Sequence, residues 1–169
     1  SLIHYKNDMG KKKVKMNETN RKTLKIRWQR LVNEGETCPR CGSTEEEVEK
    51  AVLTLKKSLN PLGIKVVLEK NVLSVLEFKK EPLQSNQILI NERPLEDWIG
   101  GEVGESPCCE VCNSDCRTIG VEGEVYKTIP AELVIKAGLL AATQLVEAKT
   151  KESCCGTAPK DPKDNCCPK

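Results

Sequence analysis

The stretch TLKIRWQRLVNEGETCPRCGSTEEEVEKAVLTLKKSLNPLGIKVVLE, residues 23–69, decides the fold class of this chain. Its beginning, TLKIRWQRLV at 23–32, alternates apolar and polar side chains and predicts a strand with one buried face. Its end, IKVVLE at 64–69, predicts a second strand. Because a helix is predicted between them, we expect the two strands to lie parallel in one sheet.

The predicted helix has a recognisable signal at each end. Apolar residues recur at helical spacing over 48–59. Ser43 and Glu46 fit a capping box, in which the serine caps the first turn and the glutamate three residues later returns a hydrogen bond. We therefore expect the helix to begin after Ser43, which leaves Cys41 outside it, and to end at the NPLG sequence of residues 60–63.

The remaining sequence completes a three-layer α/β domain with a mixed sheet. The domain covers residues 23–148, between a disordered N-terminal extension at 1–22 and a flexible, cysteine-rich tail at 149–169. The further elements that we expect are a short helix at 74–80, a third strand at 87–91, a return into a short strand or helix within 91–100, a cysteine-rich loop at 108–116, a β-hairpin at 117–129 and a largely buried helix at 130–148.

Composition argues against two kinds of partner. The net charge is +2 and no basic stripe is interleaved with aromatic residues, so we expect no nucleic-acid partner. No apolar run approaches the length that spans a bilayer, and the first residues contain no hydrophobic signal core. We therefore expect no membrane association and a cytoplasmic location.

Ten cysteines are the unusual feature of this composition. In a reducing compartment, so many cysteines indicate metal binding or redox chemistry rather than a framework of disulfides. They are also clustered, which favours a shared ligand over bonds between distant elements. The groups are Cys38 and Cys41; Cys108, Cys109, Cys112 and Cys116; Cys154 and Cys155; and Cys166 and Cys167.

The group at 108–116 predicts the main metal site. Thiolates select soft ions such as Cu(I), Zn(II), Hg(II) and As(III). Cys108, Cys109 and Cys112 supply the three thiolates that As(III) takes, with Cys116 as an additional or structural thiol. Four cysteines also suit Zn(II) or an iron–sulfur cluster, although their spacing matches no standard ferredoxin run.

The tail carries the two pairs of adjacent cysteines, Cys154-Cys155 and Cys166-Cys167. Adjacent cysteines rarely form a disulfide with each other, but they can share one soft ion. Because the tail contains glycine and proline, we expect the pairs to swing to the domain or to a partner, with a raised effective concentration. These metal-binding pairs would capture or deliver the ion, which implies a metal acceptor protein.

Cys38 and Cys41 allow two interpretations, and both stay open. In a redox pair, Cys38 is the nucleophile and Cys41 the resolving thiol, and a nearby helix N-terminus and Arg40 lower the thiolate pKa. That interpretation implies a redox partner. In a metal knuckle, the CxxC at 38–41 joins the CxxC at 109–112 in a four-thiolate zinc site.

The run CPRCGSTEEEVEKAV…LGIKVVLEK…ILINERPL is similar to the small thioredoxin-like redox proteins, which keep active cysteines in a CxxC loop between a first strand and a first helix. Residues 23–145 also resemble an uncharacterised thioredoxin-like family, described only as a domain of unknown function, through CPRCGSTEEE, PCCEVC and CRT. The resemblance implies a thioredoxin-like domain. Such enzymes usually have a cis-proline before the third strand, where this chain reads Ser85-Asn86-Gln87.

The sequences SPCCEVCN and SCCGTAPKDPKDNCCPK resemble the cysteine sets of arsenical metallochaperones, which are also thioredoxin-like. Mercuric reductases likewise use an adjacent pair in a mobile tail to hand over metal. This second resemblance implies binding and transfer of a soft metal or metalloid ion.

Three functions therefore follow from the sequence. We favour a carrier that binds and passes on a soft ion of the As, Hg or Zn type. The alternatives are a thiol–disulfide oxidoreductase with Cys38 and Cys41 catalytic, and a zinc-stabilised binding module without turnover. The carrier requires the loops at 38–41 and 108–116 to lie on the same side of the domain.

Overall fold

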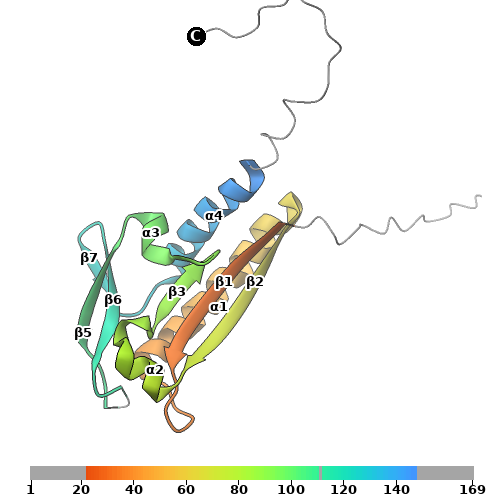
Figure 1. The fold of residues 1–169 in the computed structure, drawn as a ribbon. Coiled ribbons are helices and arrows are strands. Elements are labelled where there is room, and N and C mark those ends of the chain that lie inside the picture. Colours follow the sequence, from red (N-terminus) through yellow and green to blue (C-terminus); the bar gives the residue numbers. More distant parts are fainter. Residues whose placement is uncertain (1–21, 111, 148–169) are drawn as a thin grey trace, which may run out of the picture.

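The computed structural model describes residues 22–110 and 112–147 (Figure 1). The predicted extension at 1–22, apart from Lys22, and the predicted tail lie outside the described residues. In chain order the elements are β1 (Lys22–Leu31), α1 (Pro39–Leu59), η2 (Asn60–Leu62), β2 (Ile64–Leu73), α2 (Val75–Lys80), η3 (Pro82–Gln84), β3 (Gln87–Ile90), β4 (Arg93–Pro94), α3 (Leu95–Ile99), β5 (Glu102–Pro107), β6 (Asp115–Val121), β7 (Glu124–Tyr126) and α4 (Ala131–Glu147).

The first sheet has the strand order β2-β1-β3-β4 and is mixed. β1 and β2 are parallel, whereas β3 runs antiparallel to both β1 and β4. The predicted parallel pair and the predicted mixed α/β fold are thus confirmed. Alternation along β1 buries Leu24, Ile26 and Trp28 completely, which places the central strand in the core.

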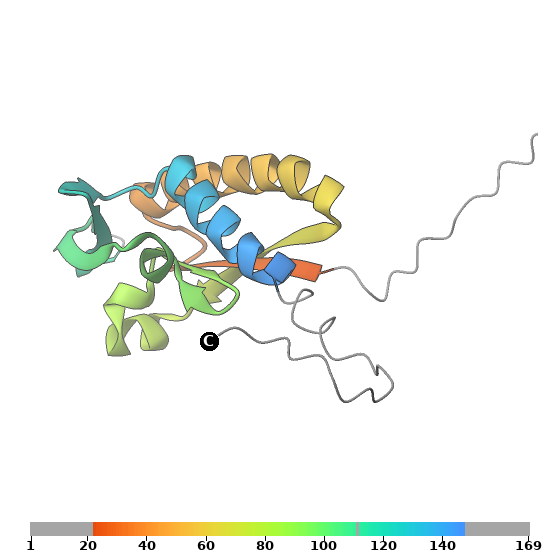
Figure 2. The same ribbon diagram turned by 90° about the horizontal axis from the view of Figure 1, so that it is seen from above.

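Helices cover this sheet on both sides. Figure 2 shows α1 and α4 on one side of the first sheet and α2 on the other. α1 and α4 approach closely at Gly138, where an added Cβ atom would lie 2.6 Å from Cδ1 of the buried Leu55. None of the helices within residues 22–110 and 112–147 combines the length and the apolar character that crossing a membrane requires.

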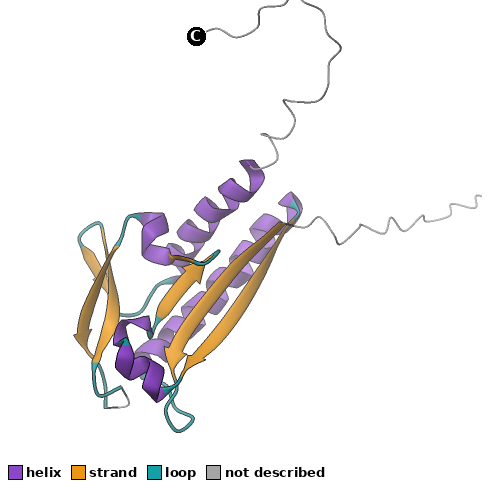
Figure 3. Ribbon diagram, in the orientation of Figure 1, coloured by secondary structure: helices purple, strands orange, loops and turns teal. Residues whose placement is uncertain are grey.

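A second, three-stranded sheet stands beside the first (Figure 3). Its order is β5-β6-β7, with both pairs antiparallel. Glu122 and Gly123 join β6 to β7 with φ values of 53° and 87°, as a two-residue hairpin turn requires, so the predicted hairpin is confirmed. β5 was not predicted from the sequence. It pairs Ser106 with Cys116 and so places the cysteine loop at one end of this sheet.

A buried ion pair fastens the second sheet to the rest of the domain. Arg117 of β6 donates hydrogen bonds to the Glu96 carboxylate of α3 and, at 2.9 Å, to the Leu83 carbonyl of η3. The side chains of Arg117 and Glu96 are only 5% and 7% exposed. Because burial disfavours a lone charge, each of these two residues depends on the other.

The start of α1 differs from the prediction. The helix begins at Pro39, and Cys38, not Ser43, is its N-cap. Thr44 accepts the Ile129 N–H at 3.2 Å and Glu47 accepts the Ala131 N–H at 3.0 Å, so polar residues of this stretch hold the start of α4 instead. Pro39 at the first helical position is the sequence signal for the true start, because proline lacks the N–H that is unpaired there anyway.

Candidate metal centre

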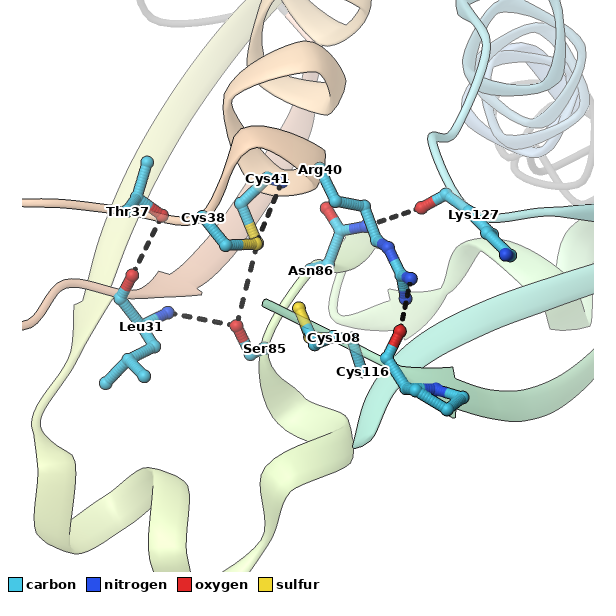
Figure 4. The surroundings of a disulfide bond; sticks show 11 residues. Leu31, Thr37, Cys38, Arg40, Cys41, Ser85, Asn86, Cys108, Cys116 and Lys127 are labelled. Carbon is cyan, nitrogen blue, oxygen red and sulfur yellow. Dashed lines mark hydrogen bonds between the residues drawn. A yellow bond between two sulfur atoms is a disulfide. The ribbon is translucent and has the colours of Figure 1, made fainter. Parts of the chain in front are cut away.

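Four sulfur atoms converge where α1 meets the second sheet. The Sγ atoms of Cys38, Cys108, Cys112 and Cys116 all lie within 4.8 Å of one another. Cys38, Cys112 and Cys116 are buried and Cys108 is half-buried. Figure 4 shows Cys38 on the first turn of α1 beside Cys108 and Cys116 at the end of the β5–β6 hairpin. The loops at 38–41 and 108–116 therefore meet, as the carrier hypothesis requires.

Each sulfur atom is positioned by a different local element. Cys38 ends the loop after β1 and caps α1, and its carbonyl accepts the Gly42 N–H at 3.0 Å. Cys116 lies in β6, and Cys108 directly follows β5. The Cys112 N–H donates to the Cys109 carbonyl at 3.2 Å, so a tight turn directs Cys112 back to the group.

Arg40 connects the two segments that supply these thiols. Its guanidinium donates a hydrogen bond of 3.0 Å to the carbonyl of Pro107, the residue before Cys108 (Figure 4). Since Arg40 lies between Cys38 and Cys41 in the first turn of α1, this bond holds the helix start against the end of β5. From the sequence we expected Arg40 to act only through its charge, whereas the hydrogen bond to Pro107 shows that it also positions the two segments.

Cys38 lies in surroundings that favour its thiolate. Its pKa is lowered from the ordinary 9.0 to about 5, chiefly by a hydrogen bond from the Cys41 thiol. Hydrogen bonds from the backbone N–H groups of Cys41 and Arg40 act in the same direction, against the opposing effect of burial. The Cys41 N–H donates to the Cys38 Sγ at 3.4 Å, so the sulfur serves as the helix cap.

Two thiols beside Cys38 are held neutral. The pKa of Cys41 is raised, chiefly by its hydrogen bond to Cys38 and then by burial. Burial, followed by the charge on Cys38, raises the pKa of Cys112 to about 12. With the Cys108–Cys116 bond formed, the negative charge of this group of thiols therefore lies on Cys38.

Ser85 supports Cys41 from the position where the sequence lacks a cis-proline. Its hydroxyl oxygen lies 3.8 Å from the Cys41 Sγ and accepts the Leu31 N–H at 3.0 Å. Because that oxygen already accepts from the backbone, its own hydrogen is free to point at the Cys41 sulfur. The fully buried Ser85 thus fixes Cys41 behind Cys38. Nothing in the local sequence around Ser85 indicated this contact.

Cys108 and Cys116 form a disulfide, with their Cα atoms 5.4 Å apart. The bond closes the loop that joins β5 to β6. Cys38, Cys41, Cys109 and Cys112 are free thiols. The same four converging sulfur atoms thus exist in a form with one disulfide, and reduction of that bond gives four free thiols.

A cavity of about 370 Å³ adjoins the centre. Cys112, Asn113, Phe78 and Pro82 form part of its wall. The cavity provides room for a ligand beside the buried thiols.

The structure unites part of the predicted ligand set. Cys108, Cys112 and Cys116 of the predicted main site join Cys38 of the predicted redox pair. Cys41 and the half-buried Cys109 are free thiols outside this group of four. The tail thiols Cys154, Cys155, Cys166 and Cys167 lie outside the described residues. The assignment of individual cysteines as ligands stays a prediction.

Comparison with known proteins identifies relatives without a known activity. Residues 24–138 match the family described as "Domain of unknown function (DUF2703)". An uncharacterized protein of Archaeoglobus fulgidus is 46% identical over 112 residues, which cover 66% of this chain and 82% of the relative. No solved structure matches the chain.

Proposed function

We propose that this chain, which belongs to the DUF2703 family, binds a soft metal or metalloid ion through Cys38, Cys108, Cys112 and Cys116 in their reduced form. The observation that carries the proposal is the convergence of these four sulfur atoms within 4.8 Å. A tetrahedral Zn–S site with bonds of about 2.3 Å separates its sulfur atoms by roughly 3.8 Å. Once the Cys108–Cys116 bond is reduced and its two sulfur atoms move apart, the four thiols are close enough to enclose such an ion.

Zn(II) fits the full set of four thiolates best, because closed four-cysteine sites are typical of that ion. As(III) would need only three of the four, and Hg(II) also prefers sulfur. Cys38 is already a thiolate at neutral pH, so it offers the first attachment point. Cys112 must lose its proton, which makes binding stronger at higher pH.

The carrier role extends this proposal to the tail. We infer that Cys154-Cys155 and Cys166-Cys167 capture the ion or hand it to an acceptor protein in the cytoplasm. Adjacent thiols on a tether suit exchange, because each transfer replaces one sulfur ligand by another of the same kind. The four-sulfur centre supports this role as the site that the tail would load or unload.

A thioredoxin-like oxidoreductase is the second candidate. A CxxC at the first turn of α1, directly after β1 of a mixed sheet, supports it. The pKa of about 5 at Cys38, with the neutral Cys41 behind it, is the specific observation in its favour. This is the arrangement of a nucleophilic thiolate with a resolving partner. The Cys38 side chain is only 1% exposed, however, so a protein disulfide cannot reach it without local rearrangement.

The test separates the centre from the tail. In the full-length chain, the four tail cysteines are changed to serine, and the reduced protein is titrated with Zn(II) and, separately, with As(III). Native mass spectrometry should find one ion per chain. Cys38→Ser and Cys112→Ser should each weaken binding by ~100-fold or more, beyond the loss typical of an outer-shell change.

Three other outcomes separate this proposal from the alternatives. Reduced protein that takes up neither ion removes the metal function. If that protein instead reduces insulin and loses this activity with Cys38→Ser, the oxidoreductase is favoured. A protein that is purified with one Zn(II) and unfolds when a chelator removes it is a zinc-stabilised module, since binding energy then serves folding.

A further inference from the structure

A disulfide of the same chain, Cys108–Cys116, lies beside the Cys38 thiol. Its sulfur lies within 4.8 Å of both Cys108 and Cys116, which are bonded to each other. The Cys38 side chain is 1% exposed and that of Cys41 is also 1% exposed. A thiol that is buried beside a disulfide meets that bond far more often than any disulfide in solution, because the folded chain sets a high effective concentration.

We propose that Cys38 and Cys41 exchange electrons directly with Cys108 and Cys116, so that a single disulfide moves between the start of α1 and the β5–β6 hairpin. This internal relay goes beyond ion binding and requires no metal. The geometry that supports it is the four-sulfur convergence together with Cys41, which lies in the same helical turn as Cys38 and contacts its sulfur.

The exchange balances without any added oxidant or reductant. The Cys38 thiolate attacks one sulfur of the Cys108–Cys116 bond, that bond breaks, and the other sulfur leaves as a thiolate. Cys41 gives up its proton to this thiolate and then attacks the Cys38 sulfur of the mixed disulfide. The products are a Cys38–Cys41 disulfide, one thiol and one thiolate. Two electrons have passed from the first pair to the second.

The surroundings favour both steps. The Cys41 N–H donates a hydrogen bond of 3.4 Å to the Cys38 sulfur, which favours the anion that attacks. Ser85, 3.8 Å from the Cys41 sulfur, stabilises the charge that develops there when Cys41 loses its proton. The Arg40–Pro107 hydrogen bond keeps the hairpin end in place while the S–S bond is open.

Electrons enter or leave this relay at Cys108. It is the half-buried member, whereas Cys38, Cys41 and Cys116 are at most 1% exposed. The fitting outside partner is therefore a dithiol or a disulfide, which would react at Cys108 while the α1 pair stays covered. The relay thus lets a buried pair exchange electrons with a partner that it never touches.

The relay also sets which thiols remain for an ion. A disulfide at Cys38–Cys41 leaves three thiols, those of Cys108, Cys112 and Cys116, whereas a disulfide at Cys108–Cys116 leaves only Cys38 and Cys112 in the group of four. This consequence alone rests on the proposed ion binding. The electron exchange stands or falls independently of it.

The test follows disulfides in metal-free protein. Full-length chain with the four tail cysteines changed to serine is reduced, kept with a chelator and treated with one equivalent of diamide. Samples are quenched with acid over time, alkylated and mapped by peptide mass spectrometry. The proposal expects both the Cys38–Cys41 and the Cys108–Cys116 disulfide, interconverting at a rate that stays constant on tenfold dilution.

Two variants block the exchange at different steps. Cys41→Ser cannot resolve the intermediate and should accumulate a disulfide from Cys38 to Cys108 or Cys116. Cys38→Ser should hold the Cys108–Cys116 bond only. Cys109→Ser is the matched control, because it removes a neighbouring thiol that takes no part in either step, and should keep the interconversion.

The proposal is overturned if the Cys108–Cys116 bond persists beside free Cys38 in both the parent protein and the Cys41→Ser variant. An interconversion that slows in proportion to dilution also overturns it, since exchange between chains would then be responsible. The dilution result needs no substitution within the folded domain, so a variant that fails to fold cannot obscure it. If the two disulfides interconvert but the protein binds no ion, the proposed ion binding is wrong and the electron exchange still holds.

Discussion

The start of α1 and the end of the β5–β6 hairpin supply thiols to one centre, but they hold them by different means. At α1, backbone N–H groups stabilise Cys38 as an anion. In the hairpin, strand register places Cys116, and a covalent bond restrains it to Cys108. One side is thus charged and reactive through local hydrogen bonds, whereas the other is neutral and fixed by long-range pairing. The predictions below test this contrast.

The largest effect should come from the anchor of the hairpin. Arg117→Met leaves the buried Glu96 carboxylate without its partner, and we expect a loss of about 3–5 kcal/mol in the free energy of unfolding. Urea unfolding measures it. Arg93→Met is the matched control: Arg93 is exposed, stacks on Trp98 and donates to the Asp97 carbonyl, so we expect a loss of at most about 1 kcal/mol. Equal losses in the two variants would contradict the anchoring role.

A smaller effect should distinguish the two hairpin cysteines that flank Cys112. In reduced protein without tail cysteines, Cys116→Ser should weaken Zn(II) binding ~100-fold, because it removes a member of the converging group. Cys109→Ser should change the affinity by less than ~10-fold, since Cys109 is outside that group. Competition with a chelator measures both. The reverse order would support the set predicted from sequence, in which Cys109 is a main ligand.

The charge on the α1 side should appear in a pH titration. Thiolate absorbance in the ultraviolet should rise with a midpoint near pH 5 in the unsubstituted protein, and this step should be missing in Cys38→Ser. Because the pKa is lower in the folded state than in the unfolded chain, Cys38 stabilises the fold fully above about pH 9. That stabilisation is lost as the pH falls from there toward 5. A midpoint above pH 8 would show that the helix start does not favour the anion.

The smallest effect should come from the contact that joins the two sides. Arg40→Met removes the hydrogen bond to the Pro107 carbonyl, and we expect a loss of about 0.5–1.5 kcal/mol in the free energy of unfolding. The electron exchange should also slow, because the helix start and the hairpin end are then less well aligned. Lys80→Met, an exposed change on α2 outside the cavity beside the centre, serves as the control and should affect neither quantity. An unchanged exchange rate in Arg40→Met would show that packing alone aligns the sulfurs.

The same contrast explains what the sequence could predict. β1, β2 and α1 were recognised because periodic apolar residues report directly on burial, as Leu24, Ile26 and Trp28 do. β5 was missed because its sequence, EVGESP, contributes no fully buried side chain and shows no apolar alternation. Pairing with β6, rather than any local preference, makes it a strand.

The centre was predictable only in part for a related reason. Cysteine spacing indicated a shared ligand for the two segments, but it could not choose among neighbouring thiols. The choice of Cys108 and Cys116 over Cys109 follows from the β5–β6 register, which the sequence did not reveal. Cys38 joined the group because the helix begins at Pro39, earlier than the Ser43 capping signal suggested.

The sulfur of Cys38 has two roles, since the atom that would hold an ion also accepts the Cys41 N–H in the first turn of α1. A cation or a new S–S bond withdraws electron density from that sulfur and weakens the hydrogen bond from Cys41. The change therefore reaches the polypeptide backbone without any displacement of the helix as a whole. Hydrogen–deuterium exchange at the Cys41 amide would accelerate whenever the sulfur is engaged, giving the domain its own internal indicator of occupancy.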